Sequence, residues 1–206
     1  MGGVPAPADR GRGPSLGPKV GVIALQGAFA EHAAALEALG AHAVLVRDPG
    51  ALAGVDAVVL PGGESTTMSL LLGSSGLYDV LAERLEAGVP AFGTCAGLIL
   101  LARDVTDGRR DQRSFGVLDV SVARNGYGRQ RESFEVPLDI PDAGAEPFPG
   151  VFIRAPRITD VGPSVAVLAR VDGDPVLVRQ GPLLAAAFHP ELSGDLRLHH
   201  LFLERV

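Results

Sequence analysis

From Lys19 onward the sequence alternates short, continuous apolar runs with helix-like stretches, and this alternation restricts the fold more than any other feature. Continuous apolar runs suit strands that are buried on both faces, and strands separated by helices pair in parallel. The pattern therefore predicts a three-layer α/β fold, with helices on both faces of a mostly parallel, twisted sheet. The expected strands are residues 20–25, 43–46, 57–60 and a run ending at Phe92, and the expected helices are 30–39, 70–85 with an interruption at 73–76, and 96–102.

The second half of the chain has a different character. A charged loop at 107–113 is followed by β-like stretches at 116–123 and 134–140. Asp172-Gly173 is typical of a hairpin turn, so the apolar runs on either side of it are expected to pair as antiparallel strands. The remaining elements expected here are the hairpin strands 165–171 and 175–178, a last strand at 184–188 and a closing helix at 195–204.

The composition fits one globular domain and argues against several classes of protein. Of 206 residues, 47% are hydrophobic, so residues 19–206 are expected to form one domain after a disordered tail (1–18) rich in Gly, Pro and Ala. The net charge of −6 argues against binding nucleic acid, and no apolar run is long enough to cross a membrane. A single cysteine, without a Cys/His cluster, predicts no metal site, no internal disulfide and a cytoplasmic location.

The single cysteine, Cys95, lies between two glycines in Gly-Thr-Cys-Ala-Gly, directly after the run that ends at Phe92. A tight turn from a buried strand into a helix pushes one side chain outward, and flanking glycines let substrate approach closely. The unpaired N–H groups at a helix start also favour a thiolate. Cys95 is therefore a candidate nucleophile, and the alternative is a buried cysteine that acts as a small apolar side chain.

A second glycine turn, Pro-Gly-Gly-Glu-Ser-Thr-Thr, follows the strand at 57–60. In open α/β sheets ligands bind beyond the carboxyl ends of the strands, where this loop and the Cys95 turn both lie. If the two turns are neighbours, the N–H groups of Gly63 and Ala96 can converge on one developing oxyanion. The alternative is a plain strand-to-helix turn.

His189-Pro190-Glu191 follows the last expected strand. In an extended segment, residues two apart point the same way, so Glu191 can orient the ring of His189. With Cys95 these side chains make a nucleophile, a base and an orienting acid, although an arbitrary His-x-Glu is more often a solvated loop. The other histidines follow no long apolar strand and are weaker candidates: His32, His42, His199 and His200.

These motifs together resemble the class I, triad-type glutamine amidotransferases, which have a flavodoxin-like fold. Within that group the chain is most similar to the glutaminase subunits of bacterial pyridoxal 5′-phosphate synthases, over about 19–206. Further matching segments are Val-Ile-Ala-Leu-Gln-Gly-Ala at 22–28, Glu-His at 31–32, Arg-Asn at 124–125, Gly-Arg-Gln at 128–130, Ser-Phe-Glu at 133–135 and Gly-Val-Phe-Ile-Arg-Ala-Pro at 150–156.

The resemblance implies roles for particular residues. It implies that Cys95 is the nucleophile, His189 the general base and acid, and Glu191 the orienting member of the triad. Gln26 would lie near an interface and help to organise the oxyanion site. The residues implied to bind glutamine are Gly63, Glu64, Ser65, Arg124, Ile153 and Arg154. Arg109, Arg110 and Arg113 are instead expected to be surface residues.

The resemblance further implies hydrolysis of L-glutamine to glutamate and ammonia through a cysteinyl thioester. Free ammonia would become ammonium in neutral water, so we expect the chain to dock on a synthase, the barrel subunit that makes pyridoxal 5′-phosphate. That compound would be the product of the complex, and we expect this chain to need no cofactor. Two alternatives stay open: another cysteine hydrolase on the same scaffold, and a non-catalytic regulatory subunit.

Overall fold

The computed structural model describes residues 17–109, 111–124, 126 and 133–206. The predicted tail lies outside this part of the chain except for its last two residues. Arg110, Asn125 and the 128–130 motif also lie outside it.

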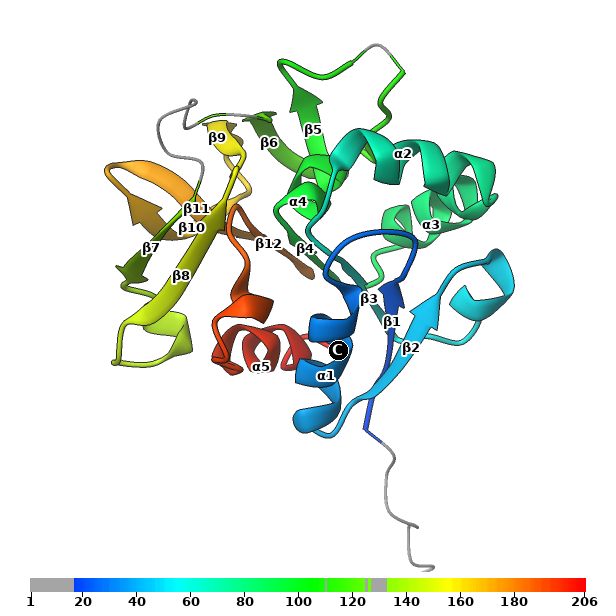
Figure 1. The fold of residues 1–206 in the computed structure, drawn as a ribbon, viewed down its shortest axis with the longest axis horizontal. Helices are drawn as coiled ribbons and strands as arrows, with labels where there is room; N and C mark the ends of the chain where they lie inside the picture. The colour runs from blue at the N-terminus through cyan, green and yellow to red at the C-terminus, as the bar shows by residue number, and fades with distance from the viewer. Residues whose placement is uncertain (1–16, 110, 125, 127–132) are drawn as a thin grey trace, which may run out of the picture.

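A sheet of seven strands forms the middle of the described structure (Figure 1). In chain order these strands are β1 (Lys19–Ile23), β2 (His42–Val46), β3 (Ala57–Leu60), β4 (Ala91–Thr94), β10 (Ala166–Val171), β11 (Asp174–Gln180) and β12 (Leu183–Ala186). Across the sheet the order is β10-β11-β12-β4-β3-β1-β2. The pairs from β12 to β2 are parallel, and β11 and β10 extend the sheet in antiparallel fashion. This arrangement confirms the predicted mostly parallel sheet.

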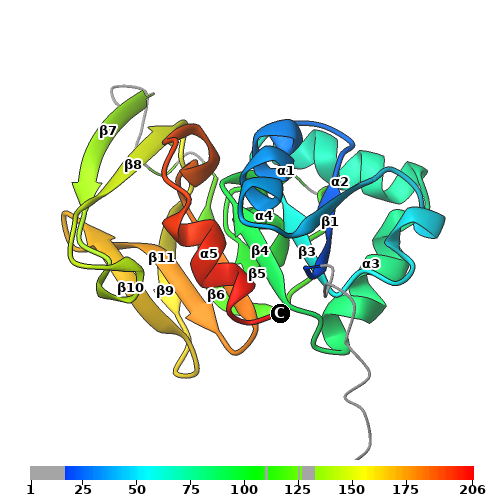
Figure 2. The same ribbon diagram turned by 90° about the horizontal axis from the view of Figure 1, so that it is seen from below.

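Helices cover both faces of this sheet, as predicted. On one face α1 (Phe29–Ala38) lies beside α5 (Arg197–Leu203), and on the other α2 (Ser65–Ser74), α3 (Leu77–Glu86) and α4 (Ala96–Leu101) pack together (Figures 1 and 2). The interruption expected between α2 and α3 is present, and Gly76 occupies it with a φ of 73°. α2 begins at Ser65, directly after the glycine turn and five residues before the apolar run that suggested the helix. The Glu64 side chain caps it and accepts hydrogen bonds from two of its first N–H groups.

Further strands stand beside the β10–β11 end of the sheet (Figure 2). β5 (Ala102–Val105), β6 (Leu118–Ala123) and β9 (Arg157–Val161) form one small sheet, and β7 (Ser133–Leu138) pairs antiparallel with β8 (Phe148–Ile153). The stretches at 116–123 and 134–140 thus each contain most of a strand, as predicted, although residues 116–117 and 139–140 lie outside β6 and β7. β5, β8 and β9 were not expected from the pattern, since exposed charged residues interrupt β5 and β9. The short 3₁₀ helices are η1 (Pro49–Leu52), η2 (Pro141–Ala143) and η3 (Pro190–Leu192).

The hairpin predicted at Asp172-Gly173 joins β10 to β11. Both residues have positive φ, 50° and 90°, as the tightest hairpin turns require. The last strand, β12, ends two residues before the predicted limit. The chain then leaves β4 for β8, where the N–H of His189 donates to the carbonyl of Val151 at 2.8 Å.

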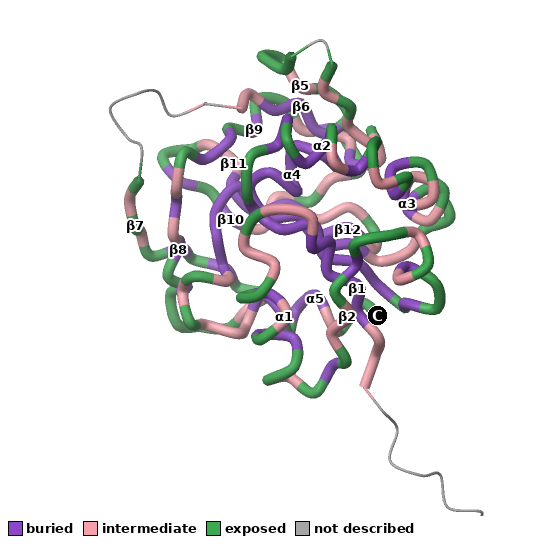
Figure 3. The backbone as a smooth tube through the Cα atoms, turned by 45° about the vertical axis from the view of Figure 1, so that its right-hand side comes forward, coloured by how far each residue is buried: buried purple, intermediate pink, exposed green. Residues whose placement is uncertain are grey.

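The hydrophobic core lies between the sheet and its helices, where the buried parts of the backbone gather (Figure 3). β3, β4 and β12 are buried at every position, which explains the continuous apolar runs of β3 and β12 and the apolar start of β4. Among the described residues, every helix is too short or too polar to cross a lipid bilayer.

Candidate active site

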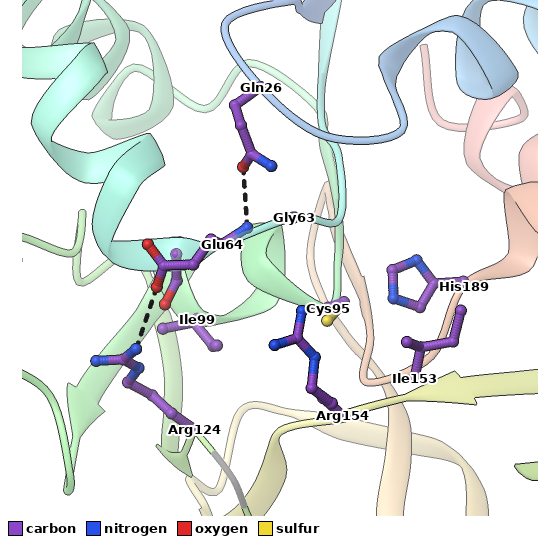
Figure 4. Close-up of a pocket in the computed structure, with 10 residues that line it drawn as sticks. Gln26, Gly63, Glu64, Cys95, Ile99, Arg124, Ile153, Arg154 and His189 are labelled. Atoms are coloured by element: carbon purple, nitrogen blue, oxygen red, sulfur yellow. Dashed lines mark hydrogen bonds and ion pairs between the residues drawn. The ribbon is translucent and has the colours of Figure 1, made fainter. Parts of the chain in front are cut away.

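Cys95 sits on the sharp turn between β4 and α4, as the sequence predicts. Its φ of 48° and ψ of −100° are strained for a residue with a side chain. The backbone holds this conformation because the N–H of Cys95 donates to the carbonyl of Ala186 on β12 at 2.8 Å. Cys95 is only 6% exposed, and it lines the pocket shown in Figure 4.

The two glycines around Cys95 allow close packing rather than flexibility. A Cβ atom on Gly97 would overlap the carbonyl oxygen of Leu60 on β3, and one on Gly93 would lie 2.7 Å from the carbonyl carbon of Gly97. Backbone therefore touches backbone on both sides of the turn. This contact seats the N-terminus of α4 directly against the sheet.

Gly97→Ala should consequently destabilise the fold. The added methyl group collides with backbone that cannot move aside, so we expect a loss of about 3 kcal/mol in the free energy of unfolding, measured by urea denaturation. Gly73→Ala on α2 is the matched control, since its Cβ would meet no atom within 4 Å. That control should gain about 0.5–1 kcal/mol. Equal stability of the two variants would contradict the packing argument.

His189 and Glu191 form a close pair beside Cys95. His189 Nδ1 lies 2.8 Å from Glu191 Oε1, and the Glu191 side chain is fully buried. The backbone differs from the expected one: Pro190–Leu192 form the 3₁₀ helix η3 instead of an extended segment. Glu191 thus reaches the ring through a tight turn, because Pro190 starts a helical turn more readily than it continues a strand.

The surroundings of His189 favour its charged form. Burial by itself would lower the pKa of His189, but hydrogen bonds and charge attraction from Cys95 and Glu191 outweigh burial and raise that pKa to about 10. At neutral pH the ring is therefore an imidazolium held between the sulfur and the carboxylate. A thiolate beside an imidazolium is the reactive form of a nucleophilic cysteine.

The glycine loop after β3 forms a second wall of the pocket. Gln26, from the loop after β1, lies over Gly63, and its Oε1 accepts a hydrogen bond from the N–H of Glu64 at 2.9 Å (Figure 4). The Glu64 carboxylate caps α2 and accepts from the Thr67 N–H at 2.7 Å. Burial would raise the pKa of Glu64, but these capping bonds outweigh it and lower the pKa to about 2.

Two arginines bring positive charge to the same pocket. Arg124 donates to Glu64 Oε1 at 3.2 Å, so a cation and an anion stand side by side (Figure 4). Arg154 follows β8 and has a φ of 43°, one of the few positive values on a residue other than glycine. Ile153 precedes it and also faces the pocket. The site therefore offers both charges to a small ligand.

The structure brings most of the candidate residues together. The pocket is lined by Gln26, Gly63, Glu64, Ser65, Cys95, Ile99, Arg124, Ile153, Arg154 and His189. Glu191 lies behind His189, and Ala96 starts α4, where its N–H has no partner within the helix. The described residues contain no group of three or more His, Cys, Asp or Glu side chains that could hold a metal ion.

Sequence reasoning missed two residues of this site. Ile99 lies one helical turn after Cys95, a spacing that could have identified it. Gln112 comes from the charged loop, where its Nε2 donates to Ser65 Oγ at 3.2 Å and its Oε1 accepts from Thr66 Oγ1 at 3.3 Å. Arg109 is exposed and pairs with Asp111, and Arg113 is exposed over the ring of Tyr78.

The comparison with known families decides the relationship. The model of the SNO glutamine amidotransferase family matches residues 22–206. This chain belongs to that family. The matched range contains every candidate site residue, from Gln26 to Glu191.

Curated relatives match this chain over nearly their whole length. The pyridoxal 5′-phosphate synthase subunit PdxT of Carboxydothermus hydrogenoformans is 52% identical over 188 residues, which cover 91% of this chain and 97% of that protein. The PdxT subunit of Frankia alni is 55% identical over 190 residues, 92% of this chain and 96% of that protein.

Solved structures of similar fold include a glutamine amidotransferase. The crystal structure of a glutamine amidotransferase superimposes with a TM-score of 0.84 at 50% identity, covering 90% of this chain and 97% of the other. PurLQS from Thermotoga maritima, at 17% identity and a TM-score of 0.63, shares the fold over 91% of this chain and 98% of the other.

Proposed function

We propose that this chain is the glutaminase subunit of a pyridoxal 5′-phosphate synthase and hydrolyses the side-chain amide of L-glutamine. One observation carries the proposal: a thiol on a strained turn shares a pocket with a histidine that a buried carboxylate orients. The PdxT relatives, subunits of such synthases by name, support the assignment of the pathway.

The proposed reaction uses Cys95, His189 and Glu191. The Cys95 sulfur attacks the amide carbon of glutamine, and the His189 imidazolium gives its proton to the departing nitrogen as the carbon–nitrogen bond breaks. Ammonia and a glutamyl thioester result. His189, now neutral, takes a proton from water, whose oxygen attacks the thioester and expels the Cys95 thiolate. The new carboxylic acid of glutamate loses its proton to solvent, and the thiolate–imidazolium pair is restored. Glu191 holds the ring in place throughout.

The charges of the pocket suit the α-amino acid end of glutamine. We infer that Arg124 and Arg154 attract its carboxylate and that Glu64 attracts its ammonium group. Gly63 and Ser65 supply polar atoms of the loop, and Ile153 supplies an apolar wall. Glu64 stays ionised throughout the neutral range because its pKa is about 2. No metal or cofactor enters the scheme.

The developing oxyanion needs hydrogen-bond donors, for which we propose the N–H groups of Gly63 and Ala96. Gln26 lies over Gly63 and holds the next N–H of the loop, so it is placed to control this site. We propose that docking on the barrel synthase completes the oxyanion site and receives the ammonia directly. The same proposal places the complex in the cytoplasm.

The test is co-purification of this chain with the candidate barrel synthase, followed by glutamine hydrolysis with and without it. We expect a stable complex and a glutaminase rate that is low alone and much higher in the complex. Full turnover without the synthase would contradict the dependence on a partner. An absence of turnover in both samples would contradict the glutaminase assignment.

Two other functions remain distinguishable by labelling. Another cysteine hydrolase on this scaffold would not take a glutamine-mimicking electrophile such as 6-diazo-5-oxo-L-norleucine onto Cys95, whereas a glutaminase would, and free glutamine should protect it. A non-catalytic regulatory subunit would bind its partner without reacting. The intact pairing of His189 with Glu191 favours the glutaminase.

A further inference from the structure

Two histidines that the proposed reaction does not use lie directly behind Glu191. His32 on α1 and His199 on α5 are both fully buried. His32 Nε2 lies 3.4 Å from Glu191 Oε2 and 3.0 Å from Thr94 Oγ1, and His32 Nδ1 lies 2.9 Å from His199 Nε2. A row of buried side chains, formed by Glu191, His32 and His199, thus runs from His189 into the interior. It lies between α1 and α5, the two helices that lie side by side in Figure 1.

The two carboxylate oxygens of Glu191 differ in their contacts. Oε1 is paired with His189, but Oε2 is buried and makes no hydrogen bond within the described part of the chain. A buried carboxylate stays ionised only when donors or positive charge face it. His32 Nε2, which contacts Thr94 Oγ1 at 3.0 Å, is a ring nitrogen that also faces Oε2, at 3.4 Å.

One arrangement of protons suits these contacts. If His199 Nε2–H donates to His32 Nδ1, then His32 carries its own proton on Nε2, where it faces Thr94 and Glu191. His199 Nδ1 then carries no proton, which fits its lack of any acceptor within the described residues. The opposite arrangement would turn a lone pair toward the carboxylate and leave a buried N–H unpaired.

Both rings are neutral at physiological pH. Burial first, and then the charges of His199 and His189, lower the pKa of His32 well below its ordinary value. Burial lowers the pKa of His199 to about 4. The edges of both rings meet Phe92, with centroids 6.0 Å and 5.7 Å apart, so the surroundings are apolar. A neutral donor can therefore support the charge of Glu191 without neutralising it.

We propose that His32 is a positioning residue that donates from Nε2 toward Glu191 and, fixed by His199, holds that carboxylate in place beneath His189. The proposal rests on the proposed function only in treating Cys95 as the nucleophile. The titratable groups of the row are Glu191 after β12, His32 on α1 and His199 on α5. The groups next to it are His189 after β12 and Cys95 before α4, and Arg154 lines the same pocket as His189.

The test compares two substitutions of equal size. His32→Gln keeps a side-chain N–H at about the reach of Nε2 and an acceptor for His199, whereas His32→Met keeps neither. Because Cys95 is the only cysteine, its alkylation by iodoacetamide, followed by intact mass against pH, reports its thiolate in the full chain. We expect His32→Met to raise the midpoint by about one pH unit, and His32→Gln to stay near the wild type.

Glutamine hydrolysis in the complex with the synthase gives a second readout. His32→Met should lower kcat by about 10- to 100-fold, the usual effect of losing an outer support, with little change in KM because His32 does not line the pocket. His200→Met, at an exposed neighbour of His199 on α5, is the control and should keep the wild-type values. Identical alkylation midpoints and kcat for the Met and Gln variants would overturn the proposal.

A measurement on the unmodified protein covers the case in which His32→Met does not fold. Long-range ¹H–¹⁵N spectra distinguish the two neutral tautomers of each histidine ring. We expect His32 to be neutral and protonated on Nε2 at pH 7, with its signals assigned by their loss in His32→Gln. An Nδ1–H tautomer or an imidazolium would overturn the proposal. Absent glutamine turnover by the wild-type complex would instead count against the proposed function alone.

Discussion

Cys95→Ala should abolish glutamine hydrolysis, with kcat in the synthase complex reduced by at least about 10⁴-fold. The substitution removes the atom that attacks the amide, and what remains of the site can only bind and polarise glutamine. The measurement is glutamate release by the purified complex. Alanine fits the space, because the Cys95 side chain is nearly buried and small.

The control measurement for Cys95→Ala is its affinity for the barrel synthase. Cys95 is 6% exposed, so its replacement should leave the affinity for the barrel synthase within about twofold of the wild type. Covalent labelling by 6-diazo-5-oxo-L-norleucine should vanish at the same time. Undiminished glutamate release by Cys95→Ala would contradict the assignment of the nucleophile, whatever the binding result.

Glu191→Gln should lower kcat by at least about 100-fold while keeping the shape of the site. The amide can still accept from or donate to His189 Nδ1, 2.8 Å away, but it carries no negative charge to stabilise the imidazolium. A neutral partner also allows the wrong tautomer of His189. Single-turnover formation of the thioester, measured by quenching and mass spectrometry, should slow by the same factor as kcat.

The pH dependence of Glu191→Gln has a definite sign. The pKa of His189 is raised to about 10, above the ordinary 6.5, so the stabilisation from its charged form is complete below about 6.5 and is lost as pH rises through 10. Removing the Glu191 charge takes away part of that rise. The alkaline limbs of both kcat/KM and stability should therefore move to lower pH, and an unchanged alkaline limb would contradict the role of Glu191.

The sequence predicted the elements whose signal is local. Buried strands such as β3 and β4 show as continuous apolar runs, and Asp172-Gly173 marks its hairpin through residue types that tolerate positive φ. Strands β5 and β9 were not predicted, because they are largely exposed and contain charged residues. Neither an alternating pattern nor a continuous apolar run identifies them as strands.

The site was predictable where it lies at strand ends and unpredictable where it depends on tertiary packing. Cys95 and His189 stand at the ends of two adjacent strands, which sequence order and fold class together imply. The pairing of His189 with Glu191 was expected for the wrong reason, since a 3₁₀ turn makes it. His32 and His199 come together because α1 packs beside α5, and no local sequence pattern predicts that contact.

The place of β12 in the sheet has a consequence for the newborn protein. β12 is inserted between β4 and β11 and pairs Ala186 with Thr94, next to Cys95. Cys95 precedes both β12 and His189 in the sequence, so it is synthesised before the strand that brings His189 next to it. A nascent chain that has not yet reached His189 therefore carries this thiol without the histidine and the carboxylate that accompany it in the folded protein.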